Sequence, residues 1–307
     1  MTRRGWVLFT AMCLIWGIPY LLIKVAVQEL SPVTLVLLRT GIGAVLLLPI
    51  AAARGELRAL LPRWRWVLAY TVAEVTLPWL FLAVAEQRLS SSLTGLLIAA
   101  VPLVGALALL VVRADDRVDL RRAIGLVVGF AGVAALLGFN DLNGDLVAIG
   151  EIALVVLGYA VGPMIVARRL SDVPATGVIA VSLALTALVY VPLGLMQLPS
   201  RLPSVEVVGS VLVLGVVCTA VAFLLFFRLI AEAGPARAQV ITYVNPAVAL
   251  ALGVLLLGEP FTVGAGVGFA LILAGLLLAT YRRSAKAGRP TTRPQPEDPE
   301  PLDEAAS

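Results

Sequence analysis

Ten long apolar runs follow one another along the chain, and each is long enough to cross a bilayer as a helix. A membrane-spanning helix needs about 20 mostly apolar residues, and the links between these runs are short. Hydrophobic residues make up 60% of the sequence and charged residues 14%, whereas soluble domains have roughly 45–50% and about 25%. The sequence therefore predicts an all-α integral membrane protein with ten transmembrane helices. The predicted spans are Trp6–Val27, Pro32–Ala53, Trp66–Ala85, Ser90–Val112, Arg121–Phe139, Val147–Ala167, Ala175–Leu195, Val207–Ile230, Arg237–Leu257 and Thr262–Tyr281.

Lysine and arginine are divided very unequally between the two sets of segments that alternate along a ten-span chain. The set with both termini holds 19 of the 23, the alternate set holds only Arg88 and Arg201, and Lys24 and Arg39 lie inside spans. Cytoplasmic loops carry the excess of positive charge, so both termini are expected in the cytoplasm, with the protein multi-pass in the cell (plasma or inner) membrane. This distribution explains the net charge of +4 without a nucleic-acid partner.

The tail, residues 282–307, combines several prolines with mixed charge and almost no large apolar residues. Such a composition does not bury enough apolar surface to fold. We therefore expect a disordered cytoplasmic tail.

The two halves of the sequence resemble each other at an offset of 143 or 144 residues. Pro19 matches Pro163 and Lys24 matches Arg168, and "AAVPLVGALALLVV" in the first half matches "YVNPAVALALGVLL" in the second. Each half then has five spans, and an odd number forces the second copy to enter the membrane in the opposite direction. The prediction is two inverted five-helix repeats, residues 1–141 and 142–281.

Small residues at helical spacing mark the fifth and tenth predicted spans, and they let helices approach closely. Packing within the chain is the favoured interpretation, and a homodimer formed through the same faces is the alternative. The glycines are Gly125, Gly129 and Gly132 in the fifth span and Gly264, Gly268 and Gly275 in the tenth.

Several of these motifs resemble the EamA-type transporters of the drug/metabolite transporter superfamily. The resemblance rests on "IWGIPYLLIK", on "PVTLVLLR" and on "NPAVALALGVLLLGEPFTVGAGVGFALILAG", and it covers about residues 6–281. The first half departs from the pattern, because "RADDRVD" puts Asp115 or Asp116 where the second half has Glu259. The resemblance implies a ten-helix bundle with a central cavity lined by spans 1, 3, 4, 6, 8 and 9. It also implies transport of small metabolites, often amino acids or drug-like compounds.

Four charged residues inside or beside the spans are candidates for binding a substrate or coupling its transport, because such residues are costly in a bilayer. Arg39 lies about 12 Å deep at 1.5 Å per residue, so it is expected to face protein or a wet cavity. Glu74 is a candidate for reversible protonation or amine binding, with a structural carboxyl as the alternative. Glu151 is expected to be a partner of Arg39 or Lys24. Lys24 is close enough to a span end to extend to the interface, which is its alternative role.

Aromatic and amide side chains inside the spans are candidates for lining the cavity, since they combine apolar walls with polar tips. Interfacial anchoring is the alternative for the aromatic residues. Five prolines, which are Pro19, Pro78, Pro102, Pro163 and Pro246, are expected to interrupt their helices. The cavity-lining candidates are Trp16, Tyr20, Trp79, Tyr159, Tyr243 and Asn245.

The residue inventory argues against an enzyme and against bound cofactors or metals. There is no histidine, and the two cysteines, Cys13 and Cys218, lie in apolar runs and are expected to be packing residues. No catalytic residue, metal ligand set or phosphate-binding loop is recognised. The preferred function is a secondary transporter for small organic solutes, with export as the preferred direction. A non-transporting membrane receptor or regulator is the alternative.

Overall fold

A computed structural model describes residues 1–112, 120–139 and 145–280, and all regular secondary structure in these ranges is helical. The predicted tail and the "RADDRVD" stretch with Asp115 and Asp116 lie outside the described residues. The helices of the first half are α1 (Arg3–Ile15), α2 (Pro19–Ala26), α3 (Pro32–Ala53), α4 (Glu56–Leu60), η1 (Leu61–Arg63), α5 (Trp64–Tyr70), η2 (Thr71–Thr76), α6 (Leu77–Glu86), α7 (Ser91–Ile98), α8 (Val101–Val112) and α9 (Leu120–Phe139). Those of the second half are α10 (Leu146–Arg169), α11 (Ala175–Met196), α12 (Val205–Gly215), η3 (Val216–Val221), α13 (Ala222–Ala233), α14 (Pro235–Ala238), α15 (Ile241–Leu257) and α16 (Val263–Thr280).

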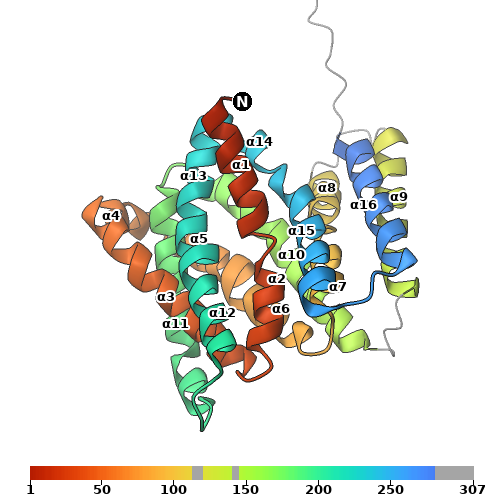
Figure 1. The fold of residues 1–307 in the computed structure, drawn as a ribbon. Helices are drawn as coiled ribbons and strands as arrows, with labels where there is room; N and C mark the ends of the chain where they lie inside the picture. The colour runs from red at the N-terminus through yellow and green to blue at the C-terminus, as the bar shows by residue number, and fades with distance from the viewer. Residues whose placement is uncertain (113–119, 140–144, 281–307) are drawn as a thin grey trace, which may run out of the picture.

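Eight helical segments of the described chain are long and apolar enough to cross a membrane, and two shorter apolar helices, Ile241–Leu257 and Val263–Ala279, follow them. The start of α1 and the end of α16 lie at the same end of the bundle (Figure 1). We call this the N-terminal end. The opposite end holds the connections from α2 to α3, from α6 to α7 and from α11 to α12.

Helices from the two halves interleave throughout the bundle. The closest packing joins α9 to α16, α3 to α11, α10 to α6, α15 to α7 and α12 to α2.

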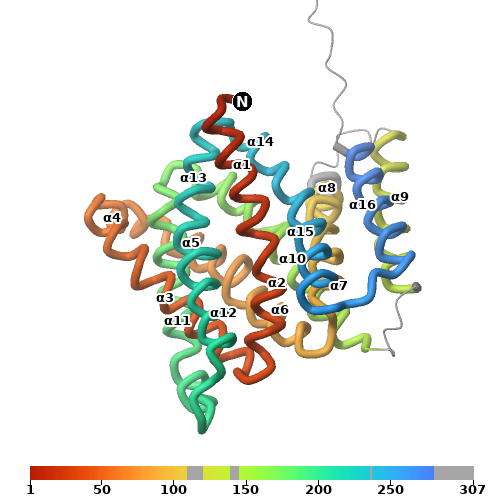
Figure 2. The backbone as a smooth tube through the Cα atoms, in the orientation of Figure 1, coloured from red at the N-terminus to blue at the C-terminus, as the bar shows by residue number. Residues whose placement is uncertain are grey.

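The α9–α16 pair forms one side of the molecule (Figure 2). An added Cβ at Gly275 would collide with the backbone N of Gly129, and one at Gly125 would lie 2.7 Å from the carbonyl oxygen of Gly275. The glycines therefore serve packing within the chain, which confirms the favoured interpretation.

The prolines divide into two groups. Pro19 begins α2 after a break in the helix, and Pro102 lies in the first turn of α8. The prediction is wrong for Pro78, Pro163 and Pro246. Pro78 lies inside the continuous helical segment Glu56–Glu86, and the other two lie inside α10 and α15. A buried membrane helix tolerates proline when neighbouring groups replace the lost hydrogen bond.

Two π-helical turns, η2 and η3, lie 145 residues apart in equivalent long helices of the two halves. A π-helical turn shifts the side chains that follow it around the helix axis, and such turns are often found at functional sites. Both lie inside long, mostly apolar runs with no break in the pattern, so the sequence does not reveal them. They place Glu74 in one half and Cys218 and Thr219 in the other.

The long helix that contains η2 is tied to α10 at both ends; we call these helices the α10 pair. At the N-terminal end Arg63 Nη2 lies 2.7 Å from Asp172 Oδ2. At the opposite end Arg88 pairs with Glu151 and lies 3.2 Å from Asp145 Oδ2. The hydrogen bonds from Arg63 hold the pKa of Asp172 below its ordinary value.

The long helix that contains η3 is tied to α1 and α2 at both ends; we call these helices the α1–α2 pair. Thr2 Oγ1 donates a hydrogen bond to Glu232 Oε1 at the N-terminal end. Ser204 N–H donates to Glu29 Oε2 over 2.8 Å at the opposite end. The hydrogen bonds from the Ser204 hydroxyl and backbone lower the pKa of Glu29.

Candidate functional site

Arg39 lies inside the bundle, as its depth in the apolar run predicts. Its residue surface is 7% exposed, and its Nε donates a hydrogen bond to Thr219 Oγ1 over 3.1 Å. The guanidinium carbon lies 3.7 Å from the centroid of the Trp79 ring. Stacking on an aromatic face compensates a desolvated cation by an amount of about 2 kcal/mol. Helix α3 provides the cation, η3 the hydroxyl and α6 the ring.

The helical geometry around Thr219 explains its orientation toward Arg39. The Thr219 hydroxyl donates to the carbonyl oxygen of Leu214 over 2.8 Å, a bond across five residues that follows from the π-helical turn. Its oxygen therefore remains able to accept from Arg39. Gly43 leaves room on α3, since an added Cβ there would lie 2.9 Å from Thr219 Cγ2. Sequence analysis missed Thr219, because a single threonine in an apolar run carries no distinguishing pattern.

Two tyrosines complete a polar layer around Arg39. Tyr20 on α2 is buried and Tyr159 on α10 is half-buried, and both lie near enough to the guanidinium to interact with it electrostatically. The layer thus joins Arg39, Trp79, Tyr20 and Tyr159, which are four of the ten predicted site residues. It contains one fixed positive charge and several hydrogen-bonding groups.

Glu74 lies on η2, on the N-terminal side of this layer. Its Oε2 atom is buried and has no hydrogen-bond partner among the described residues. Gly162 on α10 makes room for the carboxyl, because an added Cβ there would collide with Oε2 and lie 2.9 Å from Glu74 Cδ. Tyr159 is near enough to both Glu74 and Arg39 to interact electrostatically with each.

Glu86 is a further buried carboxylate, and the sequence analysis did not select it. It is the last residue of α6 and is 0% exposed, and both of its carboxylate oxygens lack a partner in the described chain. Lys24 lies beside it, but the ammonium donates to the carbonyl oxygens of Glu86 and Leu89 over 2.7 and 2.8 Å. Lys24 therefore binds the corner between α6 and α7.

The predicted partnership of Glu151 with Arg39 or Lys24 is wrong. Glu151 lies in the second turn of α10 and pairs with Arg88, which also contacts Asp145. Depth along the membrane placed Glu151 near the two cations, but depth does not specify which helices are neighbours. Glu259 has the capping role that its position after α15 predicts, since it accepts from the N–H groups of Ser91 and Ser92 at the start of α7 over 2.7 and 2.9 Å.

The remaining three candidates lie elsewhere. Trp16 stacks against Phe223 and Phe226, with ring centroids 5.7 and 4.7 Å away. Asn245 is buried on α15, and in the amide orientation that satisfies it the nitrogen donates to the carbonyl oxygens of Cys13 and Ile241. Tyr243 is half-buried and packs against the main core. These contacts are consistent with packing roles.

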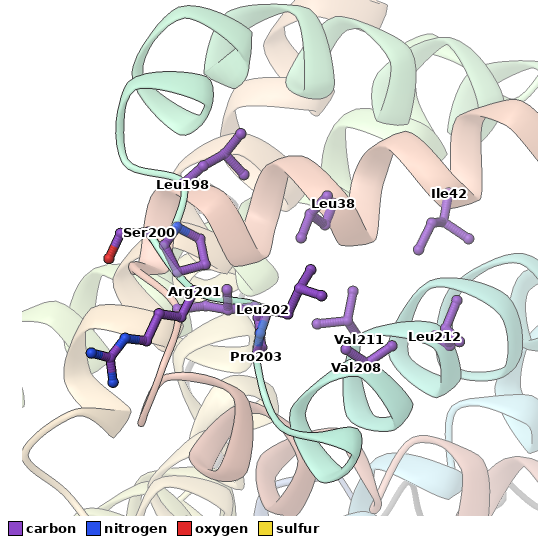
Figure 3. Close-up of a pocket in the computed structure, with 12 residues that line it drawn as sticks. Leu38, Ile42, Leu198, Ser200, Arg201, Leu202, Pro203, Val208, Val211 and Leu212 are labelled. Carbon is purple, nitrogen blue, oxygen red and sulfur yellow. The ribbon is translucent and has the colours of Figure 1, made fainter.

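A groove of about 520 Å³ opens between α3 and α12 toward the opposite end of the bundle (Figure 3). Its walls are apolar side chains such as Leu38, Ile42 and Val211, and residues 198–203 cross its edge. The Arg201 guanidinium points away from these walls in Figure 3. The groove contains none of the predicted site residues, so the polar layer is not part of it.

Comparison with known proteins assigns the chain to a family. The model of the EamA-like transporter family matches residues 3–138 and again residues 146–281. The chain belongs to the EamA-like transporter family. It is accordingly a multi-pass membrane protein of a transporter family, and its helical architecture agrees with two tandem EamA regions.

Individual relatives support this EamA assignment. An uncharacterized transporter of Archaeoglobus fulgidus is 23% identical over 91% of this chain and 100% of its own length. The uncharacterized transporter YvbV of Bacillus subtilis is also 23% identical, over 92% of this chain and 93% of its own. A crystal structure with 23% identity and a TM-score of 0.62 covers 91% of this chain and 98% of the other, which shows that the fold is shared.

Proposed function

We propose that this EamA-type protein is a secondary transporter that carries small organic solutes by alternating access, with export as its direction. The substrate class is metabolites such as amino acids or drug-like compounds. The scaffold is ten spanning helices in two inverted repeats, residues 1–141 and 142–281, with both termini in the cytoplasm. A buried cation in a membrane bundle marks a solute or ion path by default, and Arg39 is the observation that carries this proposal.

The packing supports an inverted repeat. Two contacts between the halves have counterparts with the roles exchanged: α12 packs on α2 as the helix of α6 packs on α10, and α1 packs on α15 as α8 packs on α10. The two π-helical turns are 145 residues apart. The end contact between Arg88 and Asp145 has its counterpart in that between Glu232 and Thr2. Two pseudo-symmetric halves can exchange conformations, which is the basis of alternating access.

Within this proposal, Arg39 binds an anionic group of the solute. A guanidinium presents planar paired donors that match a carboxylate. In the structure it uses Nε for Thr219, and its face lies on Trp79. Glu74, with its unpartnered oxygen, takes and releases a proton to reset the carrier. Tyr20 and Tyr159 supply hydrogen bonds near both groups.

Flux measurements in reconstituted vesicles test the proposal, with a defined mixture of amino acids and small carboxylic acids as the probe, with and without a proton gradient. Arg39→Ala should abolish flux in a folded, inserted protein, and Arg39→Lys should rescue it poorly. The matched control is Arg201→Ala, which removes an exposed guanidinium at the groove. Flux of Arg39→Ala equal to wild type would show that the buried charge is structural only.

Topology is tested separately by cysteine labelling in a background without Cys13 and Cys218. Leu61 and Leu202 are 70% and 97% exposed. Leu61 follows α4 on the link from α3 to α5, and Leu202 lies on the connection from α11 to α12 at the opposite end. A cysteine at position 61 should react from the cytoplasm and one at position 202 from outside. Labelling of both from the same face would refute the ten-span topology.

A further inference from the structure

The corner between α6 and α7 holds the strongest electrostatic anomaly among the described residues. Glu86 is 0% exposed, and neither carboxylate oxygen accepts a hydrogen bond there. An ionised carboxylate that is buried without a partner costs several kcal/mol or more. A group of this kind persists in a fold only when it is uncharged or when a cation reaches it.

The charged and titratable groups around Glu86 come from four elements. Lys24 and Tyr20 lie on α2, Arg39 on α3, Tyr159 on α10 and Glu259 on the turn after α15. Two of these groups, Lys24 and Arg39, are positively charged, and Glu259 is a second carboxylate. Neither cation forms a hydrogen bond with the Glu86 carboxylate. Arg39 is already bound to Thr219 and stacked on Trp79.

The Lys24 ammonium lies beside Glu86, yet it binds backbone carbonyl oxygens and not the carboxylate. Its ammonium donates to the carbonyl oxygens of Glu86 and Leu89. The Glu259 carboxylate is likewise used, since it accepts from two N–H groups at the start of α7. The hydroxyl oxygens of Ser91 and Thr94, on the first turns of α7, are also buried without partners. The corner therefore holds one carboxyl group and two hydroxyl groups without partners in the described part of the chain, and a proton on Glu86 removes the cost of a buried charge.

The two carbonyl bonds of Lys24 connect different parts of the bundle. Lys24 belongs to the α1–α2 pair, whereas Glu86 and Leu89 end the long helix of the α10 pair. The ammonium thus ties the two pairs together at the opposite end. At the equivalent position of the second half, Arg168 is exposed, so the tie exists at one end only.

We propose that Glu86 is a proton-binding site that controls this tie. Glu86 carries a proton in the arrangement of the present structure, in which Lys24 binds the two carbonyl oxygens. When the proton leaves to water at the opposite end, the carboxylate attracts the Lys24 ammonium into an ion pair with the Glu86 side chain. The two carbonyl hydrogen bonds break, one ion pair forms, and the Leu89 carbonyl and the turn of residues 87–90 are freed. The inference rests on the proposed transport function, because the role that it gives to Glu86 is to couple release of a proton to opening of the transporter at the opposite end.

The first test does not involve transport. Infrared difference spectra of the full-length protein in lipid, recorded as pH rises over a range of about 5 to 9, should show loss of a protonated-carboxyl band. Glu86→Gln should lose the part of that band that Glu86 contributes and keep the part that Glu74 contributes, whereas the control Glu206→Gln, which changes an exposed glutamate on α12, should keep the whole band. A difference spectrum that is the same in Glu86→Gln and wild type would overturn the proposal.

Hydrogen exchange of residues 87–90 gives the mechanical readout, after correction for the intrinsic pH dependence of exchange. In wild type, exchange should accelerate as Glu86 loses its proton; in Glu86→Gln it should remain slow at every pH. Lys24→Met should exchange quickly at every pH, and it keeps the test decisive if Glu86→Gln fails to fold. Exchange in Lys24→Met that is slow, or that follows pH as wild type does, would refute the inference. Absence of solute flux in wild type would instead remove the transport proposal and leave the proton site standing.

Discussion

The α10 pair and the α1–α2 pair each join a long helix of one half to a helix of the other half, but different contacts hold the two pairs together. The α10 pair has ion pairs at both ends and a glycine contact in its middle, where Gly158 lies against the carbonyl oxygen of Ala73. The α1–α2 pair has single hydrogen bonds to Glu232 and Glu29 at its ends. Its middle is aromatic, with Trp16 against Phe223 and Phe226.

This difference teaches that the repeat preserves helix order and contact partners while side chains diverge. Both solutions hold two long antiparallel helices together at both ends. Backbone contact through glycine allows no adjustment, because close-packed atoms have no space to move. Aromatic side chains can change their tilt. The α10 pair should therefore be the more rigid of the two, and the following changes examine that contrast.

The largest effect is expected from Gly158→Ala. An added Cβ would collide with the Ala73 carbonyl and lie 2.8 Å from Pro78 Cγ, so the α10 pair must separate. Overpacking of this kind costs about 1–3 kcal/mol. The control is Gly150→Ala on the same helix, where an added Cβ meets nothing within 4 Å. Thermal unfolding in detergent should show a lowered Tm for Gly158→Ala only. Equal Tm values for the two variants would contradict the rigid contact.

Trp16→Ala should have a smaller effect. It removes two ring contacts in the α1–α2 pair, each worth about 0.5–1.5 kcal/mol, and neighbouring aromatic rings can partly fill the space. Trp16→Phe should recover most of the loss. The comparison variant is Trp6→Ala, since Trp6 is 57% exposed and its ring packs against Phe9 of the same helix. A Tm reduction larger than that of Gly158→Ala would reverse the proposed order of rigidity.

The smallest effect is expected from the contacts at the helix ends, and it should appear in how Tm depends on pH and salt concentration. The pKa of Asp172 is lowered by Arg63, so this contact contributes fully above the ordinary aspartate pKa of about 4. Its contribution is lost as the pH falls through the lower folded-state value. Asp172→Asn should remove that part of the acid dependence of Tm and reduce its salt dependence, because exposed ion pairs are screened. If the Tm of Asp172→Asn depended on acid and salt as that of the wild type does, the ion pair between Arg63 and Asp172 would contribute nothing to stability.

Much of the helical order follows from the sequence, since apolar runs of bilayer length coincide with the helices. The inward direction of Arg39 also follows, because its depth makes a lipid-facing cation too costly. The ion pair of Glu151 does not follow, because it depends on which helices adjoin. Glu86 escaped notice because it ends an apolar run next to Arg88, where a carboxylate ordinarily reaches water. Thr219 depends on a π-helical turn that the apolar pattern conceals.

The central claim is that the polar layer around Arg39 opens to one face of the membrane at a time. Cys218 lies beside Thr219 on η3 and is 1% exposed, and Cys13→Ala leaves it as the single cysteine. Its modification by an impermeant thiol reagent, applied to either face of oriented vesicles, measures access directly. In the wild type, Cys218 should react slowly from both faces. In Lys24→Met, it should react faster from the opposite end and more slowly from the N-terminal end. Reaction from a single face in both proteins, or rates that rise together from both faces, would contradict alternating access.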